Sequence, residues 1–179
     1  MEHPLSKFKF CPICGSTHFE INNFKSKKCG SCGFTYYANP SSATVAFIIN
    51  EKDELLAVRR KNEPAKGTLD LPGGFVDMEE TGEEGVMREV MEETGLTINH
   101  LKYFGSQPWP YPSGLMVGFT ADYVDGEIHL QKEELSRGKW FTKNNLPTIP
   151  EKLSIARLLL EELRVSRIEI ASARVSQGE

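Results

Sequence analysis

The sequence predicts an α+β fold in which a mixed β-sheet is sandwiched between helices, preceded by a small module that holds the cysteines. Short apolar runs separated by turn signals recur between residues 44 and 141, and helical apolar spacing occurs in residues 82–94 and 151–165. All four cysteines of the 179-residue chain lie before residue 33. We therefore expect three parts: a cysteine module over 1–38, a sheet-and-helix domain over 39–165 and a polar C-terminal tail over 166–179.

The cysteine spacing predicts a structural zinc site. Cys11 and Cys14 form one Cys-x2-Cys pair, Cys29 and Cys32 form a second, and a glycine follows each pair. Two such pairs present four thiolates to a tetrahedral Zn²⁺, which supplies much of the folding free energy of so short a segment. Disulfides are the alternative. Since the sequence shows no apolar signal peptide, we expect a reducing, cytoplasmic location and a zinc ribbon over residues 1–38.

The strands of the second domain are predicted by their apolar runs. Residues 44–49 are followed by a polar turn at 50–54 and a second apolar run at 55–58, which together predict a β-hairpin. Asp125-Gly126 predicts another hairpin turn. Further strands are expected over residues 69–71, 102–104, 116–123 and 138–141.

Capping signals and apolar spacing predict the helices. Thr81 and Glu84 fit a capping box and Gly95 fits the position just after a helix end, so a helix is expected over 82–94. Its buried stripe is predicted to consist of Val86, Met87, Val90 and Met91. A last helix over 151–165 is predicted to bury Leu153, Ala156, Leu159, Leu160 and Leu163.

Three carboxylates share the side of the first helix that faces away from this stripe. Glu89, Glu92 and Glu93 fall within about a third of the helix circumference. Like charges at this spacing repel by about 0.2–0.5 kcal/mol per pair, and Arg88 can neutralise only one or two of them. Oxygen ligands with no His or Cys nearby suit Mg²⁺ or Mn²⁺. We therefore expect a metal site, with a solvated acidic helix face as the alternative.

The longer pattern favours the metal site. Residues 74–96 have the arrangement Gly-x5-Glu-x7-Arg-Glu-Val-x-Glu-Glu-x-Gly-Leu, which resembles the Nudix box of the Nudix hydrolase family at every defining position. The preceding Leu-Pro-Gly-Gly at 71–74 also fits, because glycines let a loop carbonyl approach a cation closely. The resemblance implies the Nudix fold and a metal-dependent pyrophosphohydrolase.

The resemblance also implies residue roles. It assigns the catalytic residues as Glu80, Arg88, Glu89, Glu92 and Glu93. The helix carboxylates would hold Mg²⁺ or Mn²⁺ or act as base, the Gly73 carbonyl would be a further ligand, and the first two residues would orient the loop and the other carboxylates. A remote glutamate usually joins such a site. Glu134, six residues before Trp140, is the expected one, and Glu133 is a close competitor.

A second family signature follows the box. Residues 106–114 contain three prolines at alternate positions, which favour an extended backbone, and Trp109 and Tyr111 offer flat surfaces on which a base can stack. The segment resembles the Ser-Gln-Pro-Trp-Pro-Phe-Pro-x-Ser signature of the zinc-ribbon NADH pyrophosphatase branch. Tyr111 replaces Phe and Gly114 replaces the last Ser. We expect Gln107, Trp109 and Tyr111 to bind substrate, with a rigid loop whose Trp lies in the core as the alternative.

The implied reaction is hydrolysis of NADH or NAD⁺ to AMP and nicotinamide mononucleotide. ADP-ribose, a dinucleoside polyphosphate or FAD remain open as substrates, because Gly114 removes a hydroxyl from the signature. A nucleotide-sensing adaptor without activity is a further alternative. Arg59 and Arg60 are candidates for phosphate contact or for simple solvent exposure.

Composition restricts the partners. A net charge of −4 gives no basic surplus for nucleic acid, so removal of NAD caps from RNA, which related enzymes perform, is neither supported nor excluded. No apolar run approaches the length of a membrane span, so we expect no membrane partner. Members of the family commonly form homodimers, which makes a homodimer an expectation here.

Overall fold

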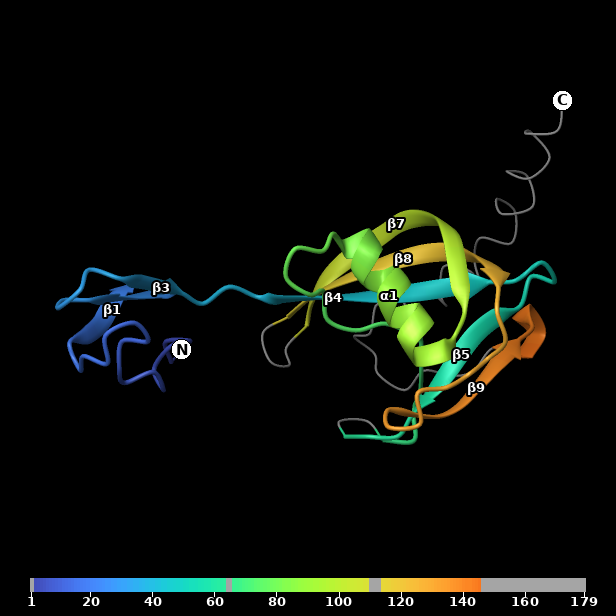
Figure 1. Cartoon of the computed structure of the whole chain (residues 1–179), viewed down its shortest axis with the longest axis horizontal. Helices are drawn as coiled ribbons and strands as arrows, with labels where there is room; N and C mark the ends of the chain where they lie inside the picture. Colours follow the sequence, from blue (N-terminus) through green and yellow to red (C-terminus); the bar gives the residue numbers. More distant parts are fainter. Residues whose placement is uncertain (1, 64–65, 110–113, 146–179) are drawn as a thin grey trace, which may run out of the picture. The chain divides into compact units, whose positions relative to one another are not determined.

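The computed structural model describes residues 2–63, 66–109 and 114–145. The chain divides into two compact units, Met1–Pro40 and Ser41–Glu179 (Figure 1). Outside the described residues lie Tyr111, the helix predicted over 151–165 and the tail predicted over 166–179. Within the described residues, no helix has both the length and the apolar character needed to cross a bilayer.

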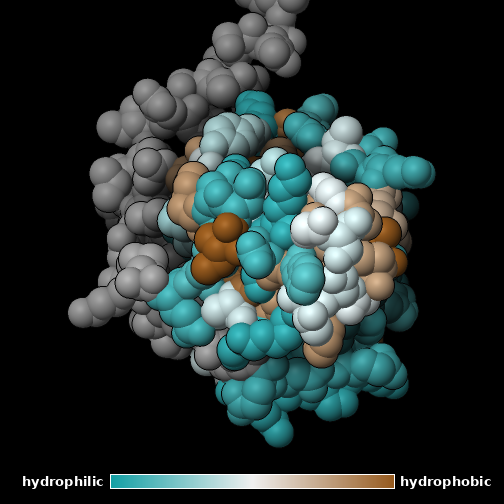
Figure 2. All heavy atoms as spheres, turned by 90° about the vertical axis from the view of Figure 1, so that its left-hand side faces the viewer, coloured by the Kyte–Doolittle hydropathy of each residue, from teal (hydrophilic) through white to brown (hydrophobic). Residues whose placement is uncertain are grey.

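The first unit is built on a three-stranded antiparallel sheet. Its strands are β1 (Phe19–Asn23), β2 (Ser26–Cys29) and β3 (Thr35–Tyr37), with β2 in the centre. Its hydrophobic cluster comprises Cys11, Phe19 and Cys29, with Phe34 packed against them. A core this small does not stabilise a fold by itself, so the unit requires a further stabilising element. The face of the molecule drawn in Figure 2 is mainly hydrophilic, with separate hydrophobic patches.

The second unit contains a six-stranded mixed sheet (Figure 1). Its strands are β4 (Ser41–Ile49), β5 (Leu55–Arg60), β6 (Leu69–Asp70), β7 (Thr97–Trp109), β8 (Gly114–Asp125) and β9 (Leu135–Phe141). The order is β6-β5-β4-β8-β7, and β9 pairs with β5. Strands β4 and β8 are parallel and the other pairs are antiparallel, which confirms the predicted mixed sheet and α+β fold. A short 3-10 helix (Lys143–Asn145) follows β9.

The loop after β6 runs beside β4, where a regular sheet would have β5. Strands β4 and β5 pair at Ile49 and Leu55, next to the turn that connects them. Farther back along β4, the backbone N–H groups of Thr44 and Ala46 instead donate to the carbonyls of Gly74 and Pro72, at 2.8 Å each. The sheet therefore opens between β4 and β5, and residues 72–74 occupy the opening.

Helix α1 (Gly82–Thr94) has the predicted bounds and caps. The Thr81 side chain accepts a hydrogen bond from the Glu84 backbone N–H, and the Glu84 side chain accepts one from the Thr81 N–H, so the capping box is complete. At the other end, Gly95 has φ of 73° and donates its N–H to the Met91 carbonyl at 2.9 Å. The helix lies across one face of the sheet (Figure 1).

The buried side of α1 differs from the prediction. Val86 and Val90 are fully buried, but Met87 and Met91 are 45% and 46% exposed, so their assignment to the core is wrong. Glu93, expected on the exposed side, is only 7% exposed. The reason is that the helix is covered on two sides, by the sheet and by the loop after β6, and this turns its buried arc toward Glu93.

The predicted hairpin at Asp125-Gly126 is also wrong, because β9 pairs with β5 and not with β8. After β8 the chain turns at Gly126, which has φ of 105° and packs on the end of α1. The His129 and Gln131 N–H groups then donate to the carbonyls of Thr94 and Glu93, at 2.8 and 3.0 Å. The chain thus follows the helix end before it joins β5.

Each face of the sheet has an apolar layer, because alternate residues of a strand point to opposite faces. The layer between the sheet and α1 contains Ala46, Ile48, Leu56, Val86, Val90, Leu96, Ile98, Phe119 and Ala121. The layer on the opposite face contains Val45, Phe47, Leu55 and Leu71. Because Leu71 anchors the start of the loop in this second layer, the loop is held between β4 and α1.

Gly126→Ala tests the contact at the helix end. A Cβ atom there would lie 2.5 Å from the Gly95 carbonyl oxygen. The alanine would also have to keep the positive φ of Gly126, which side chains disfavour. We expect the free energy of unfolding to fall by about 1–3 kcal/mol, measured by chemical denaturation. The matched control is Gly105→Ala, where a Cβ meets no atom within 4 Å. Equal free energies of unfolding for the two variants would show that Gly126 does not pack closely on the end of α1.

Candidate functional site

Two adjacent glycines form the loop side of the candidate site. Pro72 and Gly74 both direct their carbonyls to β4, so the Gly73 peptide between them faces the helix, and its N–H donates to the Glu93 carboxylate at 2.9 Å. A Cβ on Gly73 would lie 2.2 Å from the Thr44 carbonyl oxygen, and one on Gly74 would lie 2.5 Å from the Glu89 carboxylate. A Cβ at Gly73 would clash with the β4 backbone, whereas one at Gly74 would displace the Glu89 carboxylate, so the two glycines together allow this close approach.

The helix carboxylates differ in burial. Burial raises the pKa of Glu93 to about 8, and the charges of Glu89, Glu134 and Asp70 act in the same direction, whereas the Gly73 N–H opposes them. Burial also raises the pKa of Glu89. Loss of hydration is the main cause in both cases and like charges add to it, so the ionised forms of these groups are disfavoured without a nearby cation. This electrostatic setting favours a bound cation.

Arg88 organises the same site from within the helix. Its guanidinium makes a bidentate pair with Glu80, at 2.7 and 3.0 Å, and binds Glu89 at 3.0 Å and Glu92 at 3.1 Å. It also donates to the Phe75 carbonyl at 2.9 Å, which ties the loop to the helix. The hydrogen bonds from Arg88 lower the pKa of Glu80. Arg88 thus joins Glu80, two helix carboxylates and the loop, and the orienting roles of Arg88 and Glu80 stay predictions.

Glu134 is brought to the helix carboxylates by the segment that follows the helix end. Its charge raises the pKa of both Glu89 and Glu93. Glu133 is not among the charges that raise the pKa of Glu89 or of Glu93. The structure therefore favours Glu134 over Glu133 as the remote carboxylate.

The carboxylate oxygens are not yet gathered as a ligand set. Glu89 and Glu92 are directed to Arg88, and Glu93 is directed to the Gly73 N–H. Among the described residues, the cysteines are the group whose ligand atoms already lie together. The residues fit Mg²⁺ or Mn²⁺ by donor chemistry and charge.

The cysteine sulfurs of the first unit form a compact cluster. All four lie within 4.8 Å of one another, with 3.7 Å between Cys11 and Cys32 and 3.6 Å between Cys14 and Cys29. A disulfide requires about 2.05 Å, and the four cysteines are unpaired. A tetrahedral site with Zn–S bonds of about 2.3 Å has sulfur–sulfur edges near 3.8 Å. The cluster thus fits Zn²⁺ and not two disulfides.

The predicted substrate residues lie where β7 and β8 meet. Trp109, half-buried, pairs with Gly114, and Gln107 pairs with Met116. Both therefore point to the face of Met116, which packs on the layer opposite α1. A Cβ on Gly114 would lie 3.3 Å from the Ser41 carbonyl oxygen and 3.4 Å from the Trp109 Cβ, so the glycine lets Trp109 lie close to the backbone.

The two arginines of β5 hold the segment before the loop. Arg59 donates to the Gly67 carbonyl, and the Arg60 guanidinium lies 3.6 Å from the Asp70 carboxylate. Sequence reasoning missed Asp70, although its charge contributes to the raised pKa of Glu93. Its place directly before the Leu-Pro-Gly-Gly segment is the signal that could have identified it.

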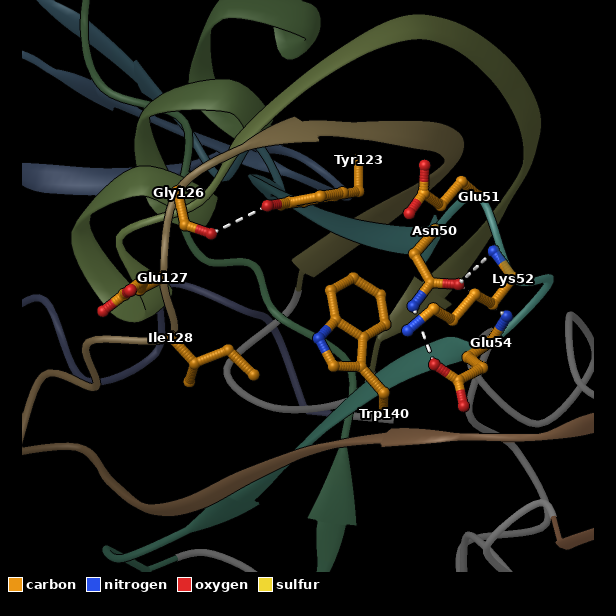
Figure 3. Close-up of a pocket in the computed structure, with 9 residues that line it drawn as sticks. All are labelled: Asn50, Glu51, Lys52, Glu54, Tyr123, Gly126, Glu127, Ile128 and Trp140. Carbon is orange, nitrogen blue, oxygen red and sulfur yellow. Dashed lines mark hydrogen bonds between the residues drawn. The ribbon is translucent and has the colours of Figure 1, made fainter.

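A separate cleft of about 430 Å³ lies beside the turn that connects β4 to β5 (Figure 3). It is lined by Asn50, Glu51, Lys52, Glu54, Tyr123, Gly126, Glu127, Ile128 and Trp140. Two hydrogen bonds join residues of its lining: the Asn50 amide donates to Glu54 at 2.9 Å, and the Tyr123 hydroxyl donates to the Gly126 carbonyl at 2.8 Å. None of the predicted site residues lines this cleft, so it is not the candidate site.

Arg88→Lys tests the organising role of the guanidinium. Lysine cannot form the bidentate pair with Glu80 and also reach the Phe75 carbonyl, so the free energy of unfolding should fall by about 1–3 kcal/mol. Urea denaturation measures it. Arg137→Lys, at an exposed position on β9, is the matched control. A loss no larger than that of the control would show that the Arg88 network contributes nothing.

Comparisons with known proteins identify the family. The model of the NUDIX domain matches residues 39–166. The chain is 37% identical over 160 residues to the NAD-capped RNA hydrolase NudC of Vibrio vulnificus and 38% identical over 162 residues to that of Haemophilus influenzae, and each match covers 89% of this chain. The chain spans 60% and 61% of the lengths of these two curated relatives.

A solved structure agrees in fold. The crystal structure of a NUDIX hydrolase from Nitrosomonas europaea has a TM-score of 0.71 and 23% identity, and the match covers 89% of this chain and 92% of that one. The family match includes the loop, helix α1 and the remote Glu134. The chain therefore belongs to the NUDIX domain family.

Proposed function

We propose that the protein is a Nudix pyrophosphohydrolase that uses Mg²⁺ or Mn²⁺ to hydrolyse the pyrophosphate bond of a nucleoside diphosphate derivative. The observation that carries the proposal is the buried Glu93 carboxylate, which is held against the Gly73 N–H while like charges from Glu89 and Glu134 raise its pKa. Such a concentration of negative charge beside a glycine loop is suited to a divalent cation and a phosphate substrate.

The chain's own residues would prepare this reaction. Glu89, Glu92, Glu93 and Glu134, with the Gly73 carbonyl, would hold the cation. When bound, the cation would neutralise the pyrophosphate and lower the pKa of a bound water. Arg88 would keep the helix carboxylates oriented through its contacts at 3.0 and 3.1 Å. The carbonyls of Pro72 and Gly74 are hydrogen-bonded to β4, and these bonds would hold the Gly73 carbonyl toward the cation.

We propose NADH or NAD⁺ as the substrate, with AMP and nicotinamide mononucleotide as products. Two observations support this choice. The relatives that match 89% of the chain are named NAD-capped RNA hydrolases, and Trp109, which is predicted to stack on a base, lies half-buried at the end of β7. NAD-capped RNA is the corresponding larger substrate. Gly114, which removes the last hydroxyl of the signature, favours ADP-ribose, a dinucleoside polyphosphate or FAD as the second candidate.

One assay tests the proposal. The purified protein is incubated with Mg²⁺ or Mn²⁺ and a panel of NADH, NAD⁺, ADP-ribose, a dinucleoside polyphosphate and FAD, and the products are identified. Release of AMP and nicotinamide mononucleotide from the first two would support the proposal. Cleavage of another member of the panel while NADH and NAD⁺ stay intact would instead support the second candidate.

We also propose that the first unit binds one structural Zn²⁺ through Cys11, Cys14, Cys29 and Cys32. The sulfur–sulfur distances of 3.6 and 3.7 Å support it. Four unpaired thiols are typical of a reducing compartment, which supports a cytoplasmic location. Separately, we propose a homodimer, because members of the family commonly form one.

The zinc proposal predicts about one Zn²⁺ per chain by elemental analysis of protein purified without chelator. Removal of the zinc should unfold the first unit, since its hydrophobic cluster is small, and leave the second unit folded. Nuclear magnetic resonance signals of the two units report this separately. Zinc-free protein with a folded first unit would contradict the proposal.

Glu93→Gln tests the catalytic assignment. The substitution keeps the shape of the side chain and removes its charge, so the turnover should fall by about a hundredfold or more. Glu83→Gln, an exposed glutamate on the first turn of α1, is the control and should keep its turnover. Turnover of Glu93→Gln within about threefold of the parent would remove Glu93 from the catalytic set.

Trp109→Ala tests the substrate pocket. Loss of stacking on the base should lower kcat/KM for NADH by roughly one to two orders of magnitude, because base–aromatic stacking is worth about 1–3 kcal/mol. Mn²⁺ affinity should stay unchanged, since the residue is not a predicted ligand. A lowered melting temperature with equal loss on every substrate would instead assign Trp109 a core role.

A further inference from the structure

The turn before β9 is attached to the end of β5 by three consecutive carbonyl groups. The Lys61 side-chain ammonium donates to the Lys132 carbonyl, the Asn62 amide donates to the Glu133 carbonyl at 2.9 Å, and the Lys61 backbone N–H donates to the Glu134 carbonyl at 2.7 Å. Two adjacent residues thus bind every carbonyl of residues 132–134. We call this contact the β5 clamp.

The other side of the turn is attached to helix α1. The Gln131 N–H donates to the Glu93 carbonyl at 3.0 Å, and the Gln131 carbonyl accepts from the N–H groups of Glu134 and Leu135, at 3.1 and 2.9 Å. The turn therefore bridges the last turn of α1 and the end of β5. Its position is determined by the helix on one side and by the β5 clamp on the other.

A β-bulge lies next to the clamp. Arg59 pairs with Arg137 but Arg60 pairs with Leu135, so the register of β5 and β9 shifts by one residue at Ser136. Bulges redirect the neighbouring side chain and are frequent beside active sites. The shift lies two residues after Glu134, where the turn passes into β9.

We propose that Lys61 and Asn62 are positioning residues that hold Glu134 at the cation site. The inference rests on the proposed function and adds to it two residues outside the Nudix box. Glu134 lies on a turn, whereas the other carboxylates lie on a rigid helix. Its carboxylate therefore depends on bonds to the turn backbone for a fixed position. Both side chains are exposed, so their removal should leave the core intact.

Mn²⁺ binding to the full chain, measured by isothermal titration calorimetry without nucleotide, tests this proposal. Asn62→Ala and Lys61→Met should each weaken binding about two- to tenfold, the range expected for one lost hydrogen bond. Lys61→Arg, which retains a donor, should restore binding. Asn99→Ala, an exposed asparagine on β7, is the matched control and should bind as the parent does. Melting temperatures of the variants should stay within about 4 °C of the parent, the shift expected for one lost hydrogen bond.

A double-mutant cycle shows whether the clamp acts through Glu134. In a Glu134→Gln background, Asn62→Ala should cause no further loss of Mn²⁺ affinity. Equal losses in both backgrounds, or no loss in either, would overturn the proposal. Because the titration contains no nucleotide, its result is separate from the substrate panel. A parent that cleaves no nucleotide would overturn the proposed function, whereas a cleaving parent with unaffected clamp variants would overturn only this inference.

Discussion

The hydrogen bond from the Gly73 N–H to the buried Glu93 carboxylate is the contact on which the site depends. It joins a loop that is held by β4 to a helix that is held by the apolar layer beneath it. The approach is possible because the loop has no Cβ at two successive positions: Gly73 lies against the Thr44 carbonyl and Gly74 lies against the Glu89 carboxylate. The opening of the sheet between β4 and β5 provides the space.

The same contact explains the electrostatics. A carboxylate enclosed by strand, loop and helix loses hydration, and Glu89 and Glu134 add negative charge, so the pKa of Glu93 rises to about 8. Arg88 does not compensate, because its hydrogen bonds go to Glu80, Glu89 and Glu92. Functional sites commonly contain groups whose ionised form is disfavoured until a ligand binds and stabilises it. Here the ligand that relieves it would be a divalent cation.

Much of the fold could be predicted from local signals, and the failures arise where long-range packing decides. The caps fixed the bounds of α1, because Thr81, Glu84 and Gly95 act within one helical turn. Met87 and Met91 were assigned to the core because helical spacing does not show that a loop covers one side of the helix. The Asp125-Gly126 hairpin failed for a similar reason, since Gly126 packs on the helix end and directs the chain to β5. The carboxylates of the box were identifiable by spacing, whereas Lys61 and Asn62 carry no motif and are recognised only by their contacts.

The most direct test is the pKa of Glu93, measured by carboxyl carbon nuclear magnetic resonance with and without Mg²⁺. In the absence of Mg²⁺ the group should titrate near 8, because it is buried among like charges. Saturating Mg²⁺ should move the titration well below that value, because a cation favours the ionised form. A Glu93 pKa near the ordinary glutamate value of about 4.3 that Mg²⁺ leaves unchanged would contradict the account.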